Sequence, residues 1–239
     1  MLSLQNCSLF IGKKKIIDNI SFDFQPGKTY ALMGPNGSGK STLASALMGH
    51  PDISYSPKTK LLVGKKNIKN LSAEKRARLG IFLSFQTPLA LPGVTVFALL
   101  RLALEKQMDP ITLHNKVKDY AKELHIKDEL LTRSLNEGFS GGEKKKLEAL
   151  QAVLLTPQFA LFDEIDTGVD VDALKTIAHF LKKHLPKTTT LVFITHSTRL
   201  LKYIRPHKVL VIKNGRLVKT GTALLSRTIE KNGFDGIAL

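Results

Sequence analysis

Apolar residues recur along the chain in two different rhythms. Short apolar runs such as "TYALMG", "IFLSF", "FALFDE" and "TTLVFITH" are typical of strands buried on both faces. Longer stretches with apolar residues three or four apart, such as "VFALLRLALEKQ", "ITLHNKVKDYAKELHI" and "DVDALKTIAHFLKKHL", are typical of amphipathic helices. The chain therefore alternates predicted strands and helices, which favours an α/β fold.

The order of these patterns predicts one domain with an insertion. "LSLQNCSLFI" and "IIDNISFDF" read as strands joined by a turn at "GKKK", and "KVLVIKNGRLVKTG" as a hairpin turned at Asn214-Gly215. "LSAEKRARLG" predicts a short helix that starts at a serine cap and ends at Gly80. We expect an α/β core at 1–86 and 157–239 with an antiparallel β subdomain, and an inserted helical subdomain at 87–156.

Composition fits a soluble globular protein. The 239 residues are 43% apolar and 23% charged. The sequence contains no long unbroken run of apolar residues, so we expect no membrane-spanning segment. We see no secretory signal, and the single Cys7 excludes an internal disulfide and leaves too few thiols to hold an iron–sulfur cluster alone. We expect Cys7 to be a buried strand residue and the protein to be cytoplasmic.

The formal net charge of +16 has three interpretations. Short lysine clusters could bind nucleic acid, but they are spread along the chain and not interleaved with aromatics, so no nucleic-acid partner is expected. A lysine-rich solvated surface is the simplest interpretation. An acidic protein partner, whose docking the charge would speed, is the third.

The stretch "GPNGSGKST" follows an apolar strand and opens a helix, the context in which G-x-x-x-x-G-K-[ST] binds phosphates. Glycines let the backbone N–H groups turn inward, and the helix adds its positive end. We expect Lys40 to reach the β- and γ-phosphates of a nucleotide and Ser41 to ligate Mg²⁺. The predicted nucleotide-binding residues are Gly34, Pro35, Asn36, Gly37, Ser38, Gly39, Lys40, Ser41 and Thr42.

Other predicted strands also end in polar residues, and ligands collect at the carboxyl ends of strands in open α/β sheets. "FALFDE" ends in Asp163, a Mg²⁺ ligand by type, and Glu164, placed to orient or deprotonate a water. Gln86 follows "IFLSF" and could ligate Mg²⁺ or water, while His196 could donate to the γ-phosphate or be a structural hydrogen bonder. Asp170 is expected in a loop after Glu164.

A second glycine-rich helix start, "FSGGE", lies beyond the helical segment. Ser140, Gly141 and Gly142 precede a predicted helix near Glu143, a tip that suits a phosphate. The chain's own phosphates are already held by the helix after Lys40. The tip is therefore expected to cap the γ-phosphate of a nucleotide held by a second copy, so that two subunits enclose two nucleotides across a two-fold axis.

In this order, "GPNGSGKST", Gln86, "FSGGE", "FALFDE", the "DTGVD" loop and His196 resemble the ABC-type ATPase cassette over nearly the whole chain. The resemblance implies Mg-dependent ATP hydrolysis, with Glu164, His196 and Gln86 as catalytic residues and Ser41, Gln86 and Asp163 at the metal. It implies that the helix tip Phe139, Ser140, Gly141, Gly142 and Glu143 contacts the ATP bound by a second copy. In most of the family this tip reads Leu-Ser-Gly-Gly-Gln. For the aromatic that usually stacks on adenine from the first strand, Phe10 is a candidate and Ile11 an aliphatic substitute.

A finer resemblance is to the SufC branch, ATPases of the Suf iron–sulfur cluster assembly machinery. It is carried by "FLSFQTPLALPGVTV", "FSGGEKKKLEALQ" and "FDEIDTGVDVDALK". It implies SufB/SufD-type scaffold partners that meet the segment after Gln86, whose apolar residues could instead form a subdomain core. The alternatives are the ATP-binding subunit of a membrane ABC transporter and, prompted by the charge, a DNA-engaging cassette.

Overall fold

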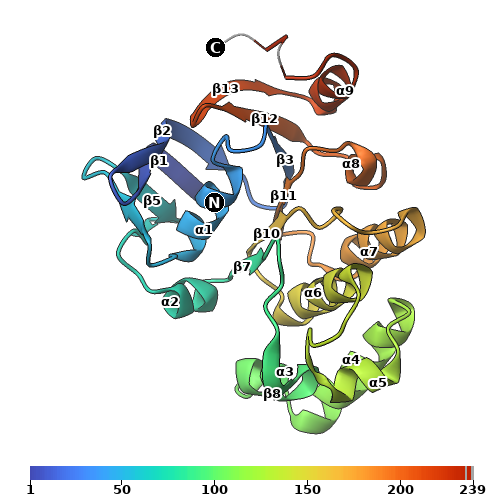
Figure 1. Ribbon diagram of the computed structural model, residues 1–239. Coiled ribbons are helices and arrows are strands. Elements are labelled where there is room, and N and C mark those ends of the chain that lie inside the picture. The colour runs from blue at the N-terminus through green and yellow to red at the C-terminus, as the bar shows by residue number, and fades with distance from the viewer. Residues whose placement is uncertain (235, 238–239) are drawn as a thin grey trace. The chain divides into compact units, whose positions relative to one another are not determined.

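The computed structural model describes residues 1–234 and 236–237 and groups them in two compact units (Figure 1). The first unit comprises residues 1–86, 157–165 and 186–239, and the second comprises 87–156 and 166–185. The segment 166–185, which sequence analysis placed in the core, thus groups with the helical insertion.

A six-stranded sheet in the order β13-β12-β3-β11-β10-β7 is the centre of the first unit. All its neighbouring strands are parallel except the β12–β13 hairpin, where Asn214 and Gly215 take φ of 50° and 75° as a tight type I′ turn requires. The strands are β3 (Thr29–Met33), β7 (Ile81–Ser84), β10 (Phe159–Asp163), β11 (Thr190–Ile194), β12 (Lys208–Lys213) and β13 (Arg216–Gly221).

An antiparallel sheet forms the predicted β subdomain of the same unit. Its strand order is β2-β1-β5-β6, and β4 also pairs with β1. The strands are β1 (Leu2–Ile11), β2 (Lys14–Phe24), β4 (Ile53–Tyr55), β5 (Lys60–Val63) and β6 (Lys66–Asn67). One apolar cluster joins this sheet, helix α1 (Lys40–Met48) and one face of the central sheet.

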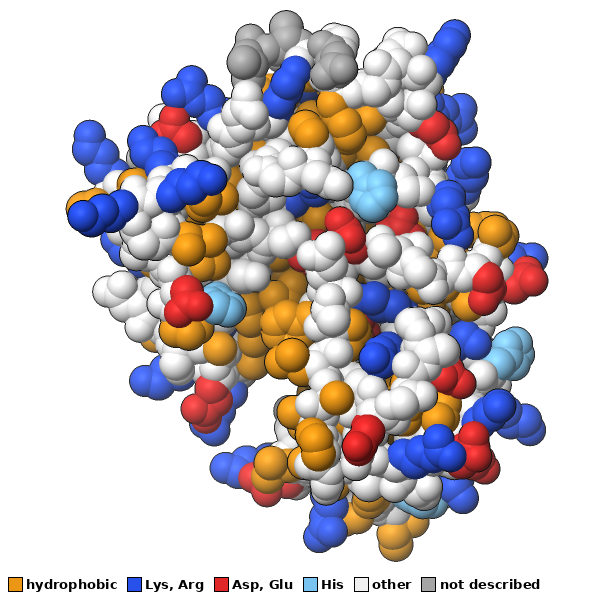
Figure 2. Space-filling view, in the orientation of Figure 1, with side chains coloured by type: hydrophobic (Ala, Val, Ile, Leu, Met, Phe, Trp, Pro, Cys, Tyr) orange, Lys and Arg blue, Asp and Glu red, His pale blue; other side chains and the backbone are white. Residues whose placement is uncertain are grey.

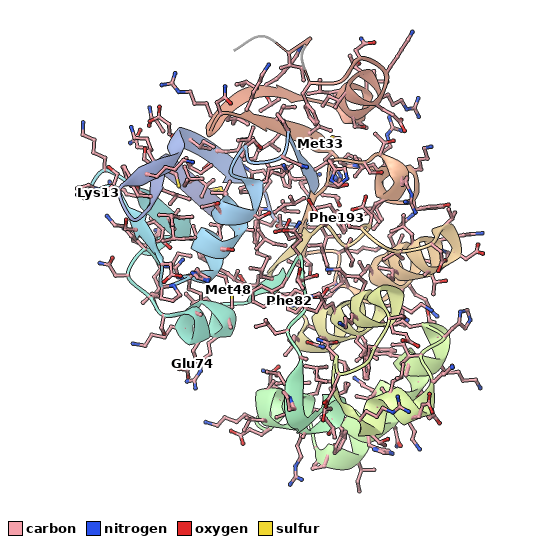
Figure 3. The ribbon with its side chains drawn as sticks, viewed as in Figure 1. Lys13, Met33, Met48, Glu74, Phe82 and Phe193 are labelled. Carbon is pink, nitrogen blue, oxygen red and sulfur yellow. The ribbon has the colours of Figure 1, made fainter. Side chains whose placement is uncertain are left out.

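Alternate residues of β3 point to opposite faces of the central sheet, as the strand repeat requires. Tyr30 and Leu32 enter the cluster with α1, whereas Ala31 and Met33 join a second cluster with α8 (Arg199–Tyr203) and α9 (Ala223–Asn232) (Figure 3 labels Met33). Aromatic rings on neighbouring strands also pack together. The ring centroid of Phe162 lies 6.0 Å from that of Phe82 and 5.2 Å from that of Phe193.

The second unit is mostly helical, but the expectation of an all-helical segment is wrong in one place. Strands β8 (Leu91–Thr95) and β9 (Ser134–Leu135) form a small antiparallel pair, because the extended "LPGVT" stretch contains a proline and a glycine that disfavour helix. The helices are α3 (Val96–Leu104), α4 (Pro110–Glu123), α5 (Asp128–Thr132), α6 (Gly141–Leu155) and α7 (Val171–His184).

Short polar side chains begin most of these helices. Thr95 accepts from the Ala98 N–H before α3, Asp109 from Ile111 and Thr112 before α4, and Ser72 from Lys75 before α2 (Ala73–Arg78). In the described part of the chain, no helix combines the length and apolar character needed to cross a bilayer.

Candidate nucleotide site

The loop "GPNGSGK" connects the carboxyl end of β3 to the first turn of α1. A side chain at Gly34 would run into the Ile212 carbonyl, and one at Gly39, where φ is 101°, would lie 2.6 Å from Ile17 Cδ1. Gly37 has φ of 74°, yet apart from its chain neighbours no atom of the described residues lies within 4 Å of where its Cβ would stand. The loop is thus pressed against β2 and β12 on one side and open at Gly37, as a phosphate cradle requires.

Lys40 is turned into this loop and is almost completely buried. Its Nζ donates to the carbonyl oxygens of Gly34 and Pro35, each at 2.9 Å. Burial lowers the pKa of Lys40, and the nearby carboxylates of Glu164 and Asp163 oppose that shift. A buried cation thus lies next to two buried carboxylates at one edge of the sheet.

Glu164 is the centre of the polar contacts at that edge. Its Oε2 accepts a 2.8 Å hydrogen bond from Gln86 Nε2, and its Oε1 lies 3.6 Å from His196 Nδ1. Asp163 and Glu164 are 4% and 9% exposed, whereas half of the His196 side chain is exposed. Glu164 also takes φ of 51°, an uncommon conformation for a non-glycine residue that re-aims the chain directly after β10.

The parallel strands explain why these residues meet. β7, β10, β11 and β3 are consecutive neighbours in the sheet, and their carboxyl ends carry Gln86, Asp163 with Glu164, His196 and the loop before Lys40. The structure thus brings together at one edge the core residues that the sequence predicted. Figure 2 shows acidic and histidine side chains close together near the middle of the view.

The predicted metal ligands supply oxygen atoms of the kinds that Mg²⁺ prefers. Ser41 offers a hydroxyl from the first turn of α1, Asp163 a carboxylate from β10, and Gln86 a carboxamide whose Nε2 already faces Glu164. No group of three His, Cys, Asp or Glu residues suited to a metal occurs among residues 1–234 and 236–237. The donor set therefore fits a cation held jointly with phosphate oxygens rather than by protein alone.

The second glycine-rich tip lies in the helical unit and begins α6. Ser140 Oγ accepts from the Glu143 N–H at 3.3 Å, and Glu143 Oε2 accepts from the Ser140 N–H at 2.8 Å, a complete capping box. Phe139 is buried beneath the tip, whereas Ser140 and Gly141 are exposed. Apart from the chain neighbours and the nearby backbone of α6, no atom of the described residues lies within 4 Å of a Cβ built on Gly142, so the packing of this unit does not require glycine there.

Comparison with known proteins decides the family. The family model described as ABC transporter matches residues 17–167, which contain both glycine-rich tips and the β10 carboxylates. The chain belongs to the ABC transporter ATPase family. Membership makes it an ATPase of the ABC type.

Relatives of this ABC cassette match it over nearly its whole length. A probable ATP-dependent transporter designated ycf16 from Cyanophora paradoxa is 39% identical over 98% of this chain and 93% of its own. A probable ABC transporter ATP-binding protein from Streptococcus pyogenes serotype M3 is 41% identical over 100% and 95% of the two chains.

Solved structures show the same fold at low sequence identity. A dimeric ATP-binding cassette in a post-hydrolysis state with ADP and Pi superposes with a TM-score of 0.78 at 18% identity, covering 93% of this chain and 99% of the other. An ATP-binding subunit of an ABC transporter gives 0.80 at 21% identity, covering 99% and 95%.

The structure extends the sequence-based expectations at three further residues of this ABC cassette. Asp170 is not merely a loop residue: it caps α7 by accepting from the Ala173 N–H at 2.7 Å, a role that an aspartate before an apolar-periodic run could have indicated. Of the two candidates for adenine stacking, Ile11 is 46% exposed at the end of β1, whereas Phe10 is half-buried with Lys15 Nζ 6.0 Å from its ring centroid.

Proposed function

We propose that this ABC ATPase drives iron–sulfur cluster assembly on a SufB/SufD-type scaffold in the cytoplasm. The support is the SufC-like set of sequence stretches, together with the convergence of Lys40, Glu164, Gln86 and His196 at one sheet edge. The cluster would be held by the scaffold, because Cys7 is buried and burial raises its pKa to about 12.

In the proposed reaction the loop from Gly34 to Thr42 holds the phosphates of ATP, with Lys40 leaving its two loop carbonyls for the β- and γ-phosphates. Glu164 orients and deprotonates the attacking water, and Gln86 holds the Glu164 carboxylate in place through the 2.8 Å hydrogen bond. His196, beside the other carboxylate oxygen, donates to the γ-phosphate.

Ser41, Gln86 and Asp163 would hold Mg²⁺, which when bound neutralises negative charge on the phosphate oxygens. Asp163 and Glu164 are adjacent in sequence. The Asp163 carboxylate can therefore face the metal, while the positive φ of Glu164 turns its own carboxylate toward the water. Removal of magnesium with a chelator is therefore expected to stop hydrolysis.

The tip of α6 is proposed to complete the site of a second copy. Gly142 supports this role because its own unit leaves the space above it open, so the reason for glycine lies outside the protomer. The first amides of α6 are among the helix donors without an intrahelical acceptor, and they suit a phosphate.

The scaffold would meet the segment after Gln86. Leu89 is 68% exposed and Leu91 37%, whereas Val96 and Leu100 are buried, so the segment divides between surface and core. The exposed part of "QTPLALPGVTVFALL" is thus available to a partner.

Co-purification with a SufB/SufD-type scaffold tests this proposal. We expect Leu89→Asp to reduce recovery of the scaffold at least about tenfold, because a charge would replace an exposed apolar contact. Leu102→Asp is the matched control, since Leu102 is 71% exposed elsewhere in the same unit. Recovery of an integral membrane permease instead of the scaffold would favour the transporter alternative. Equal recovery of the scaffold by the two variants would contradict the proposal that the segment after Gln86 contacts the scaffold.

A further inference from the structure

A groove of about 730 Å³ lies between α8 and α9 in the first unit, and no residue proposed for nucleotide binding lines it. Leu201 is buried in its floor, and Leu224 on α9 is 64% exposed at its rim. The inner face of α9 is anchored in the second apolar cluster through Leu225 and Ile229, so the walls of the groove are fixed to the sheet.

The polar lining of this groove is mainly cationic. Among the described residues, its charged lining consists of Lys202, Arg205, Arg227 and one carboxylate, Glu230. None of the three cations forms an ion pair within the part of the chain that the structure describes. By contrast, Arg216 on β13 is paired with Asp18 at 2.7 Å.

The sequence around the groove also contains many more basic than acidic residues. Residues 197–234 contain nine Lys or Arg and one acidic residue, although the whole chain has 36 and 20. Figure 2 shows basic side chains along the upper right edge of the view, where Figure 1 places α8 and α9. Such an excess of positive charge attracts polyanions and accelerates their docking.

We infer that the α8–α9 groove docks an acidic, amphipathic helical segment of a partner protein. Glutamate or aspartate side chains of that segment pair with Lys202, Arg205 and Arg227, and its apolar side chains cover Leu224. This surface is additional to the proposed scaffold contact after Gln86 and does not depend on it.

The apolar part of the groove favours a peptide over a nucleic acid. No aromatic side chain among the described residues lines the groove, so bases have no ring on which to stack. The exposed Leu224 would gain nothing from a phosphate backbone, whereas it matches the apolar face of an amphipathic helix. The concave shape between two helices likewise suits a helix better than a flat lipid surface.

Fluorescence anisotropy with defined probes tests the inference on the full chain at about 150 mM salt. The probe is a labelled 18-residue amphipathic helix with glutamates on one face and leucines on the other. A scrambled peptide of equal composition, an oligothymidine 20-mer and vesicles of phosphatidylserine and phosphatidylcholine are compared with it. We expect the amphipathic peptide to bind the parent protein most tightly.

The double variant Arg205→Glu/Arg227→Glu is expected to bind the peptide at least about tenfold more weakly. Lys65→Glu/Lys66→Glu, at the exposed turn before β6 and the first residue of β6, makes the same charge change and should retain binding. Leu224→Ser should weaken the amphipathic peptide but not the scrambled one. ATP hydrolysis by all variants should match the parent, which checks folding.

Two outcomes would overturn the inference. One is an equal loss of peptide binding in both double variants, which would mean that net charge alone is responsible. The other is oligothymidine or vesicle binding that is as tight as peptide binding and equally sensitive to Arg205→Glu/Arg227→Glu, which would assign the groove to nucleic acid or membrane.

Discussion

Glu143 shows at the scale of one residue how a departure from the usual family tip is accommodated. The common glutamine would accept the same hydrogen bond from Ser140, because either side chain closes a capping box. The carboxylate adds a charge next to the positive end of α6, and the Ser140 N–H holds the pKa of Glu143 below its ordinary value.

We predict that Glu143→Ala lowers the free energy of unfolding by about 1 kcal/mol at pH 7, and that Glu143→Gln lowers it by less than half of that. Because the folded-state pKa is lowered, the carboxylate's contribution is present above its unfolded pKa of about 4.5 and is lost as pH falls through the folded value. Urea unfolding between pH 3.5 and pH 7 measures this, and the parent should approach Glu143→Gln at the acid end. An unchanged difference across the range would contradict the charge assignment.

The identities of the site residues could be predicted from sequence, but their contacts could not. Spacing in "GPNGSGKST" and "FALFDE" is enough to place phosphate and water chemistry, because each motif follows a recognisable strand. The bonds of Lys40 to its own loop carbonyls and the positive φ of Glu164 depend on tertiary packing. No local pattern encodes either feature.

At the scale of the element, the cradle helix α1 is held at its far end by a buried arginine. Arg76 is 1% exposed and donates to the carbonyls of Ala46 and Leu47 at 2.6 and 3.1 Å, where α1 ends. Its other nitrogens donate to Leu71 and Lys69 carbonyls at 2.9 and 2.8 Å. The cation thus satisfies helix carbonyls at the negative end of the dipole.

Arg76→Met is predicted to lower the free energy of unfolding by about 3 kcal/mol, because it leaves several buried carbonyl oxygens without donors. Arg78→Met, two residues on in the same helix, is the matched control. Arg78 pairs with Glu74 at 2.7 Å on the surface, and its loss should cost less than about 1 kcal/mol. Urea denaturation measures the free energy of unfolding of both variants. Similar losses of stability would contradict the proposal that Arg76 holds the end of α1.

Elements with strong patterns were predictable and those without them were not. The serine-capped helix after Ser72 and the Asn214-Gly215 hairpin follow from local chemistry and are confirmed. The β8–β9 pair was missed because its partners lie far apart in sequence and one is two residues long. Helix α9 is an exception, because the sequence analysis does not predict it although Thr222 caps it and Leu225 and Ile229 recur at helical spacing.

At the scale of the whole molecule, hydrolysis in the proposed mechanism needs two copies. In that proposal one protomer supplies Lys40 and Glu164, and the α6 tip is expected to face the ATP of the other protomer. A solved cassette of the same fold is dimeric in a post-hydrolysis state with ADP and Pi bound. The proposal therefore separates residues that bind nucleotide from residues that seal it.

Glu164→Gln is predicted to trap an ATP-bound dimer, because hydrolysis loses its base and falls at least about 100-fold while nucleotide binding is retained. Size-exclusion chromatography with and without ATP measures the dimer.

Adding Gly142→Ala to this variant should abolish the dimer, since a methyl group would stand where the phosphate must approach. It should leave ATP affinity and melting temperature unchanged, because that space is open in the protomer. Lys40→Ala should instead remove ATP binding itself. A Glu164→Gln dimer that persists with Gly142→Ala would mean that the α6 tip does not seal the neighbour's nucleotide.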